Sequence, residues 1–169
     1  MPDSHDRLIR QAGETAKALT GKCIKQKINI ALAESCTAGL ISALIADTSG
    51  ASSVLWGSFV CYMKDAKMKM LDLDGSDLDK YGLVSKETAL SMAQGALAKS
   101  GADIAAAVTG LAEGGGNGLP AGTVWIAAAL KNGEVKTEEF HFSGSRNEVR
   151  ARAAISVLEM IEKYLPVVY

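Results

Sequence analysis

The stretch that most constrains the fold is residues 28–47, INIALAESCTAGLISALIAD, because it changes from one regular structure to another within six residues. Its first part holds Ile28, Ile30 and Leu32 in a short, mostly apolar run, which is typical of a buried strand. From Leu40 onward the apolar residues recur at helical spacing. The turn between them, ESCTAG, therefore places a carboxylate, two hydroxyls and a thiol where a buried strand ends and a helix begins.

Two interpretations of this turn are open. The first N–H groups of a helix have no intrahelical partner and lie at the positive end of its dipole, so they can hold an anion or a developing oxyanion beside Ser35. Alternatively, Ser35 or Thr37 merely caps the helix, as serine and threonine commonly do. Taken alone, the stretch favours the cap over a nucleophile.

Strand and helix patterns alternate along the rest of the chain. Helical spacing predicts helices over residues 6–25, 64–71, 85–99 and 145–165, in addition to the one that begins at residue 40. Residues 54–62 and 103–108 read as strands, and residues 123–130 and 135–142 read as an antiparallel hairpin with an Asn-Gly turn. Residues 72–82 are acidic and resemble a loop. A parallel strand-helix-strand unit and an α/β fold are the natural outcome.

A glycine-rich loop over residues 109–122 follows the strand at 103–108. Glycine lets backbone N–H groups approach a ligand closely, so such a loop can cradle a phosphate. It can equally be a mobile hairpin loop. The Gly-Lys-Ser/Thr triplet of a Walker A loop does not occur, which argues against a nucleoside triphosphatase.

Composition limits the partners. The chain has 169 residues, of which 48% are hydrophobic and 22% charged, so we expect one domain, residues 1–169, with a substantial core. Its net charge is −1 and no dense Lys/Arg run occurs, so neither a nucleic acid nor a membrane is an expected partner. A small-molecule substrate remains compatible with this balance.

Cysteine and histidine usage is sparse. The three cysteines show no C-x-x-C spacing, and the only histidines are His5 and His141, so we expect reduced thiols, no structural metal and no cofactor. No apolar run is long enough for a secretory signal or a membrane span. We therefore expect a cytoplasmic protein.

Ser35 has possible catalytic partners in Tyr62 and Lys67, near the end of the second strand. A desolvated lysine that loses its proton near neutral pH can activate a serine, so acyl transfer needs no histidine. Alternatively, Lys67 is an exposed helix lysine and Tyr62 covers the core with its ring. Spacing alone favours this second interpretation.

A resemblance over residues 8–165 reverses that judgement. The chain resembles the CinA C-terminal family through ordered motifs at residues 33–40 (AESCTAGL), 49–52 (SGAS), 60–62 (VCY) with Lys67, 82–85 (GLVS), 108–112 (VTGLA), 122–124 (GTV) and 142–150 (FSGSRNEVR). It implies a three-layer α/β/α sandwich with a mixed, largely parallel sheet, standing without the molybdopterin-binding-like half of longer relatives. It also implies hydrolysis of nicotinamide mononucleotide to nicotinic acid mononucleotide and ammonia.

The resemblance also implies roles for particular residues. Ser35 matches the family's nucleophile, Lys67 its base, and Tyr62 the hydroxyl that assists proton transfer. The residues that match substrate-binding positions are Thr37, Gly39, Thr109, Gly110, Ala112 and Arg146.

Three positions depart from the family pattern. Ala38 stands where the family usually has glycine, which matters only if this position needs a positive φ. Lys64 replaces an asparagine. Glu113 replaces the glycine of a Gly-Pro pair, and its carboxylate would repel a phosphate unless it points away or pairs with Arg146 or Lys64.

Two functions and one assembly state follow as expectations. The first function is the amidase, and the alternative is a nucleotide-binding or regulatory module that keeps the pocket without turnover. A homodimer or higher homo-oligomer would cover Trp56, Trp125 and the tail at residues 167–169. Alternatively, both tryptophans are ordinary core residues.

Overall fold

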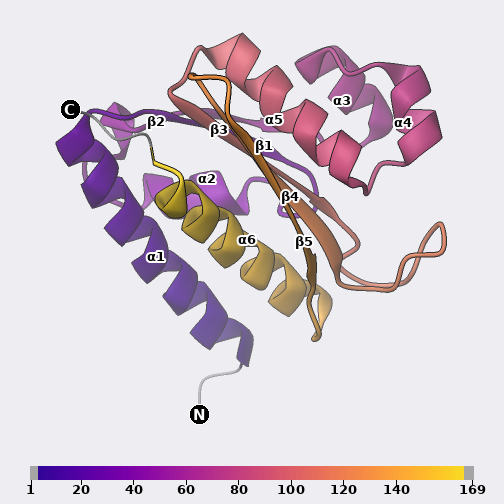
Figure 1. Ribbon diagram of the computed structural model, residues 1–169. Helices are drawn as coiled ribbons and strands as arrows, with labels where there is room; N and C mark the ends of the chain where they lie inside the picture. The colour runs from indigo at the N-terminus through magenta and orange to yellow at the C-terminus, as the bar shows by residue number, and fades with distance from the viewer. Residues whose placement is uncertain (1–3, 166–169) are drawn as a thin grey trace.

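Five strands form one sheet in the order β2-β1-β3-β4-β5 in the computed structural model, which describes residues 4–165 (Figure 1). The strands are β1 (Ile30–Glu34), β2 (Leu55–Val60), β3 (Ile104–Gly110), β4 (Thr123–Leu130) and β5 (Val135–His141). β1 is parallel to both of its neighbours, whereas β4 is antiparallel to β3 and to β5. Only β4 therefore runs against the other strands, and the predicted mixed, largely parallel α/β sheet with a C-terminal hairpin is confirmed.

Helices cover both faces of the sheet (Figure 1). α1 (Ser4–Gln26), α2 (Leu40–Ala46) and α6 (Arg146–Lys163) lie on one face, and α3 (Lys64–Leu71), α4 (Gly75–Tyr81) and α5 (Lys86–Ser100) lie on the other. A short 3-10 turn, Ala51–Ser53, precedes β2. Because successive strand residues point to opposite faces, each central strand contributes to two separate cores.

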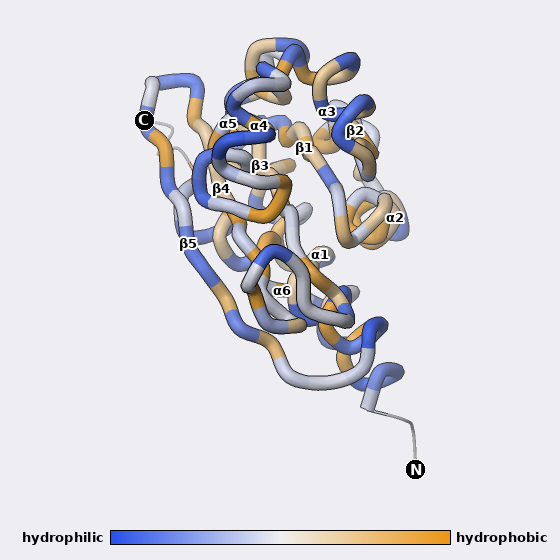
Figure 2. The backbone as a smooth tube through the Cα atoms, turned by 90° about the vertical axis from the view of Figure 1, so that its right-hand side faces the viewer, coloured by the Kyte–Doolittle hydropathy of each residue, from blue (hydrophilic) through white to orange (hydrophobic). Residues whose placement is uncertain are grey.

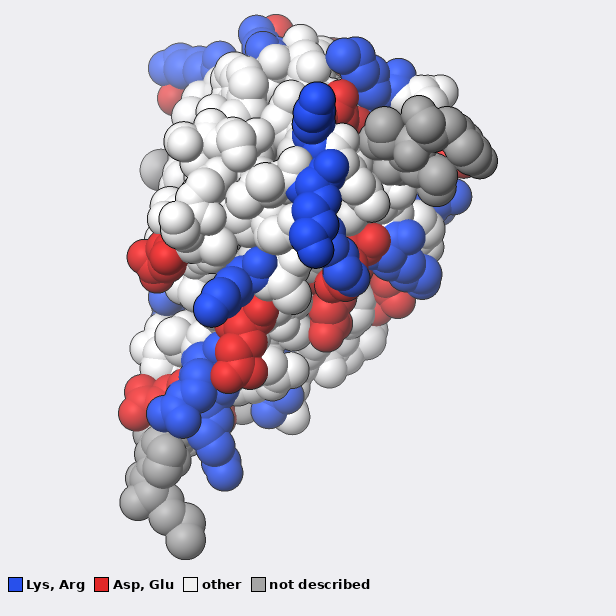
Figure 3. Space-filling view, turned by 90° about the vertical axis from the view of Figure 1, so that its left-hand side faces the viewer, with Lys and Arg blue, Asp and Glu red and all other residues white. Residues whose placement is uncertain are grey.

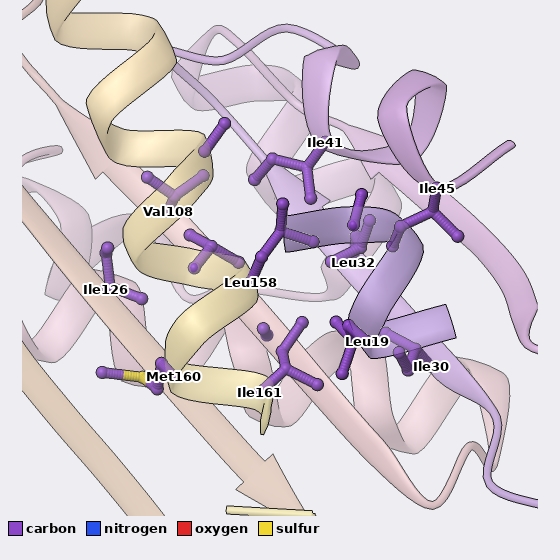
Figure 4. Close-up of a cluster of buried hydrophobic side chains, with 14 of the residues drawn as sticks. Leu19, Ile30, Leu32, Ile41, Ile45, Val108, Ile126, Leu158, Met160 and Ile161 are labelled. Atoms are coloured by element: carbon purple, nitrogen blue, oxygen red, sulfur yellow. The ribbon is translucent and has the colours of Figure 1, made fainter. Parts of the chain in front are cut away.

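The core beneath α1, α2 and α6 is built from large aliphatic side chains. Figure 4 shows Leu158 of α6 packed among residues from the sheet and from the other two helices of this layer. Ile30 and Leu32 of β1 are fully buried there, as is Leu19 of α1. Burying such side chains contributes about 1.5–3 kcal/mol each, so this layer supplies most of the apolar stabilisation.

The core beneath α5 is built from small side chains. Its sheet surface consists mainly of alanines, namely Ala31, Ala33, Ala105, Ala107, Ala127 and Ala129. Alanine lets a helix approach the sheet closely, and α5 presents Met92 together with further alanines. A Cβ added at Gly95 of α5 would lie 2.6 Å from the backbone oxygen of Leu71, so α3 and α5 also pack closely.

The interpretation of residues 72–82 as a loop was wrong, because this segment contains α4. Asp74 caps the helix by accepting a hydrogen bond from the backbone N–H of Ser76, and Leu78 is buried beneath it. A helix of two turns with one buried leucine gives too little periodicity to be recognised against an acidic background. The packing against α5 decides its conformation.

The surface carries mixed charge and one exposed aromatic edge. Lys and Arg side chains lie interspersed with Asp and Glu on the face seen in Figure 3. Figure 2 shows hydrophilic residues along much of the edge strand β5. Trp56 on the opposite edge strand is 51% exposed and stacks on Phe59, whereas Trp125 is half-buried against the alanine-rich core.

Self-association through Trp56 stays a prediction, and residues 167–169 lie outside the described part of the chain. Among residues 4–165, no helix is both long enough and apolar enough to cross a bilayer.

Gly122 joins the glycine-rich loop to β4, and we expect Gly122→Ala to destabilise the fold strongly. Its φ is +83°, and an added Cβ would lie 1.8 Å from the carbonyl oxygen of Phe142. We expect the free energy of unfolding to fall by about 3 kcal/mol or more, measured by urea denaturation. Gly118→Ala is the control, because Gly118 also has a positive φ but faces open space. Equal losses in both variants would show that backbone strain alone matters.

Candidate active site

A pocket lies beyond the carboxyl ends of β1 and β3, where Ser35 follows β1 and Thr109 is the penultimate residue of β3. From β1 the chain continues to β2 on one side, and it later returns to β3 on the other side. Ligand sites of α/β proteins commonly lie at such a switch point. The pocket has a volume of about 340 Å³. Its lining residues are Ser35, Cys36, Tyr62, Tyr81, Gly82, Leu83, Val84, Thr109, Gly110, Leu111, Ala112, Glu113, Gly116, Asn117 and Arg146.

Ser35 and Lys67 are in direct contact. The Lys67 Nζ lies 3.0 Å from the Ser35 Oγ, and it donates hydrogen bonds to the carbonyl oxygens of Cys61 at 2.8 Å and Tyr62 at 3.2 Å. Lys67 is 1% exposed, so it is not the solvent-exposed helix lysine that spacing alone favoured. Two carbonyl acceptors suit the two N–H groups of a neutral amine, whose lone pair can then accept the serine proton.

Burial lowers the pKa of Lys67 below the usual value for lysine, because the charged form loses its hydration. Within residues 4–165, no carboxylate forms a salt bridge with Lys67 to restore the charge. The smaller opposing effects come from Cys61 and Cys36. Arg146 is not among these causes, and its guanidinium contacts Tyr62 and Glu113.

The turn that carries Ser35 is held from one side by the carboxylate of Glu34, which is fully buried. Its oxygens accept hydrogen bonds from the Thr37 hydroxyl, from the backbone N–H groups of Gly39, Ile41 and Ser42, and from the Ser58 hydroxyl. The carboxylate therefore occupies the N-terminus of α2 and ties it to β2. A negative charge at this position also complements the helix dipole.

Arg150 of α6 holds the same turn from the other side. Its Nε donates to the carbonyl oxygen of Cys36 at 3.0 Å, and its Nη2 donates to that of Thr37 at 2.9 Å. Ala38, at the centre of the turn, has a φ of 50°. A left-handed conformation costs a non-glycine residue about 1–2 kcal/mol. The contacts of Glu34 and Arg150 therefore maintain a turn that the local sequence disfavours.

Thr37 and Gly39 do not line the pocket. Thr37 is fully buried, and both residues donate to Glu34, so the structure places them in support of the turn. The expected use of the α2 N-terminus for an oxyanion is wrong for the same reason, because its N–H groups already donate to Glu34. Neither Ser35 nor Thr37 is the N-cap of α2, since that position is Gly39.

Thr109, Gly110 and Ala112 do line the pocket. The Thr109 hydroxyl donates to the carbonyl oxygen of Leu83 at 2.7 Å, which connects β3 to the segment before α5. The glycine-rich loop that follows folds back through a bridge between Gly116 and Leu119. It therefore forms a small hairpin whose base borders the pocket, and its binding of a phosphate stays a prediction.

Arg146 contacts two other residues of the pocket wall. Its Nη1 lies 2.8 Å from the Glu113 Oε1, and its Nη2 donates to the Tyr62 hydroxyl at 2.9 Å. The Tyr62 hydroxyl is thus held by Arg146, while the contribution of Tyr62 to Lys67 comes from its backbone carbonyl. Lys64 pairs with Asp79 instead, so of the two cations considered for Glu113, Arg146 is the partner.

The first turn of α6, which begins at Arg146, is closed by a capping box. The Ser145 hydroxyl accepts from the Glu148 backbone N–H, and the Glu148 carboxylate accepts from the Ser145 backbone N–H. Hydrogen bonds from Ser4 and Ser145 lower the pKa of Glu148 to about 2.

Within residues 4–165, no three His, Cys, Asp or Glu side chains are arranged to hold a metal ion.

Two residues that organise the site were not assigned a role from the sequence. Glu34 ends a fully apolar strand directly before a helix, and a carboxylate at that place is a signal for capping. Arg150 lies one helical turn after Arg146, on the same side of α6. Its contact with a turn more than a hundred residues earlier depends on tertiary packing, so no local signal identifies it.

We expect Glu34→Gln to lower the free energy of unfolding by about 2–3 kcal/mol, because an amide loses the charge and turns a donor toward the N–H groups of α2. Denaturation in urea measures this loss. Glu14→Gln is the matched control, since Glu14 is exposed on α1 and should change stability by less than about 0.5 kcal/mol. A similar small change in both variants would contradict the organising role of Glu34.

Comparison with known proteins identifies relatives across most of the chain. The family model of the CinA C-terminal domain matches residues 12–165. The chain is 42% identical over 138 residues to a CinA-like protein of Syntrophomonas wolfei, which covers 80% of this chain and 33% of that protein. It is 38% identical over 163 residues to a CinA-like protein of Desulfotalea psychrophila, and the match covers 95% of this chain and 39% of that protein. The chain thus spans about a third of the length of these curated relatives.

Solved structures agree with the sequence relatives. The competence/damage-inducible protein CihA of Agrobacterium tumefaciens is 36% identical, with a TM-score of 0.87 over 90% of this chain and 94% of that one. A CinA superfamily protein of Escherichia coli is 33% identical, with a TM-score of 0.86 over 91% of this chain and 90% of that one. By sequence and by fold, this chain belongs to the CinA C-terminal domain family.

Proposed function

We propose that this chain hydrolyses the carboxamide of nicotinamide mononucleotide to nicotinic acid mononucleotide and ammonia. The observation that carries the proposal is the buried contact between the Lys67 Nζ and the Ser35 Oγ, because Ser35 lines a pocket that is also lined by Arg146. A serine beside a desolvated amine is a nucleophile beside its base.

The reaction begins with proton transfer from the Ser35 hydroxyl to the neutral amine of Lys67. The Ser35 Oγ then attacks the carboxamide carbon, and the tetrahedral intermediate collapses when Lys67 returns the proton to the leaving nitrogen. Ammonia departs and an ester to Ser35 remains. Water, deprotonated by the same amine, hydrolyses the ester and releases the acid.

The oxyanion of the intermediate needs hydrogen-bond donors other than the N-terminus of α2. Within residues 4–165, the backbone N–H of Cys36 donates to no other residue, and Cys36 lines the pocket. Arg150 binds the carbonyl oxygens of Cys36 and Thr37 and so fixes the orientation of this peptide. We assign the Cys36 N–H as a donor to the oxyanion.

The far wall of the pocket suits a nucleotide phosphate. Arg146 presents a guanidinium there, and guanidinium groups bind phosphates through paired, charge-assisted hydrogen bonds. Thr109, Gly110 and Ala112 line the same pocket as Arg146 and Ser35. A volume of about 340 Å³ is within the range of small-molecule sites.

The alternative is a binding or regulatory module without turnover. Burying a lysine without a charged partner is costly, and a pocket that only binds a nucleotide gains nothing from a buried amine on a serine hydroxyl. The retained Ser35–Lys67 contact therefore favours the amidase. An assay of ammonia release distinguishes the two functions.

We expect Ser35→Ala to abolish the release of ammonia from nicotinamide mononucleotide, in an assay without added metal, while the fold is kept. Ser35 supplies the nucleophile, and its side chain is not a helix cap whose loss would destabilise α2. Ser53→Ala, which removes an exposed hydroxyl outside the pocket, should keep full activity. A folded Ser35→Ala variant that keeps most of its turnover would show that Ser35 is not the nucleophile.

We expect Lys67→Arg to lose activity at least about 100-fold, because guanidinium does not deprotonate at working pH. In the wild type, the folded pKa of Lys67 is lowered, so kcat/KM should rise with pH through a midpoint below the usual lysine pKa and level off above it. Lys69→Arg, in an exposed pair with Asp65, should retain both rate and profile. An active Lys67→Arg variant would show that Lys67 acts as an electrostatic contact and not as the base.

A further inference from the structure

The Arg146 guanidinium is already occupied by a negative charge of the protein itself. Its Nη1 contacts the Glu113 Oε1 at 2.8 Å, while its Nη2 donates to the Tyr62 hydroxyl. Both Arg146 and Glu113 line the pocket that contains Ser35. They also line a second cavity, which is bordered by residues 142–145. The ion pair therefore borders both the pocket that contains Ser35 and this second cavity.

The pair is placed where it can exchange partners. The side chain of Arg146 is 44% exposed and that of Glu113 is 64% exposed, so solvent screens their attraction. Glu113 makes no second hydrogen bond within residues 4–165. A carboxylate with one charge is a weaker partner for a guanidinium than a phosphate monoester, which carries about 1.5–2 charges at neutral pH and three acceptor oxygens.

The position of Glu113 allows its carboxylate to leave Arg146 without disturbing the rest of the site. It lies in the loop that continues from β3, directly after Ala112, whereas Arg146 begins α6. Gly114, the next residue, has a φ of +63° and faces open space, so the loop is not packed tightly at this point. Removing the Glu113 carboxylate leaves no buried group unpaired, because the Arg146 side chain remains hydrated and bonded to Tyr62.

We propose that Glu113 is a specificity-determining residue that competes with the substrate's phosphate for Arg146. A ligand with a phosphate replaces the carboxylate and keeps the guanidinium paired, whereas a ligand without a phosphate leaves the Glu113–Arg146 pair intact. Glu113 thus weakens the binding of every phosphorylated ligand and leaves unphosphorylated ligands unaffected. The nucleotide part of this inference rests on the proposed function, but the competition at Arg146 does not.

The test measures binding by calorimetry in the Ser35→Ala background, so that turnover does not interfere. Glu113→Gln should lower the dissociation constant of nicotinamide mononucleotide about tenfold, the effect of removing one competing charge-assisted contact. The dissociation constant of nicotinamide riboside, which lacks the phosphate, should stay the same. Glu138→Gln is the matched control, since it removes the same charge from exposed β5 outside the pocket.

Two further measurements distinguish a failure of the competition at Arg146 from a failure of the proposed nucleotide substrate. In an Arg146→Ala background, Glu113→Gln should no longer tighten the binding of nicotinamide mononucleotide, because the contested group is gone. Inorganic phosphate serves as a probe that does not depend on the proposed substrate, and Glu113→Gln should tighten its binding as well.

Unchanged or weaker binding of both phosphorylated ligands in Glu113→Gln would overturn the competition. An equal gain for nicotinamide riboside would overturn it too, because the effect would then not depend on phosphate. If inorganic phosphate binds more tightly in Glu113→Gln but nicotinamide mononucleotide binds to no variant, the competition stands and the proposed nucleotide substrate fails.

Discussion

The carboxylate of Glu34 is the group on which the geometry of the site depends. It is fully buried, it accepts five hydrogen bonds, and its donors come from the turn, from the start of α2 and from β2. A buried carboxylate without these donors would cost several kcal/mol, so the turn and the helix must form together around it. Ser35 is the next residue, and its orientation follows from this arrangement.

Arg150 completes the arrangement from the opposite side of the turn. Glu34 binds N–H groups and Arg150 binds carbonyl oxygens, so the two charges do not compete for the same atoms. Together they hold Ala38 in a left-handed conformation that a short loop on its own would avoid. Strain of this kind persists only where the surrounding structure over-determines it, and such positions cluster at functional sites.

The two faces of the sheet contribute differently to this site. The large aliphatic core beneath α1, α2 and α6 supplies stability, and α6 also brings Arg146 to the pocket and Arg150 to the turn that carries Ser35. The alanine-rich core lets α5 and α3 lie close to the sheet, which brings Lys67 from α3 under the end of β1. The lysine is desolvated there, since its side chain is only 1% exposed.

Much of the fold follows from periodicity. The apolar runs of β1 and β3, the helical spacing of α1 and α6, and the Asn-Gly turn between β4 and β5 are local patterns, and the structure agrees with them. α4 was missed because two turns with a single buried leucine carry too weak a pattern. The resemblance of ordered motifs to one family, and not spacing, singled out Ser35 and Lys67 as a pair.

By itself the sequence determined the strands, every helix except α4, the position of the strand-to-helix turn and the family, because these depend on residues close to one another along the chain. Only the tertiary structure decided that Lys67 is buried against Ser35, that Glu34 consumes the N–H groups of α2, and that Glu113 and Arg146 are partners. The physical reason is that burial, pKa and charge pairing depend on neighbours in space. Residues that are separated by 32, by 33 or by more than 100 positions in the sequence become neighbours only when the sheet and its two helical layers have assembled.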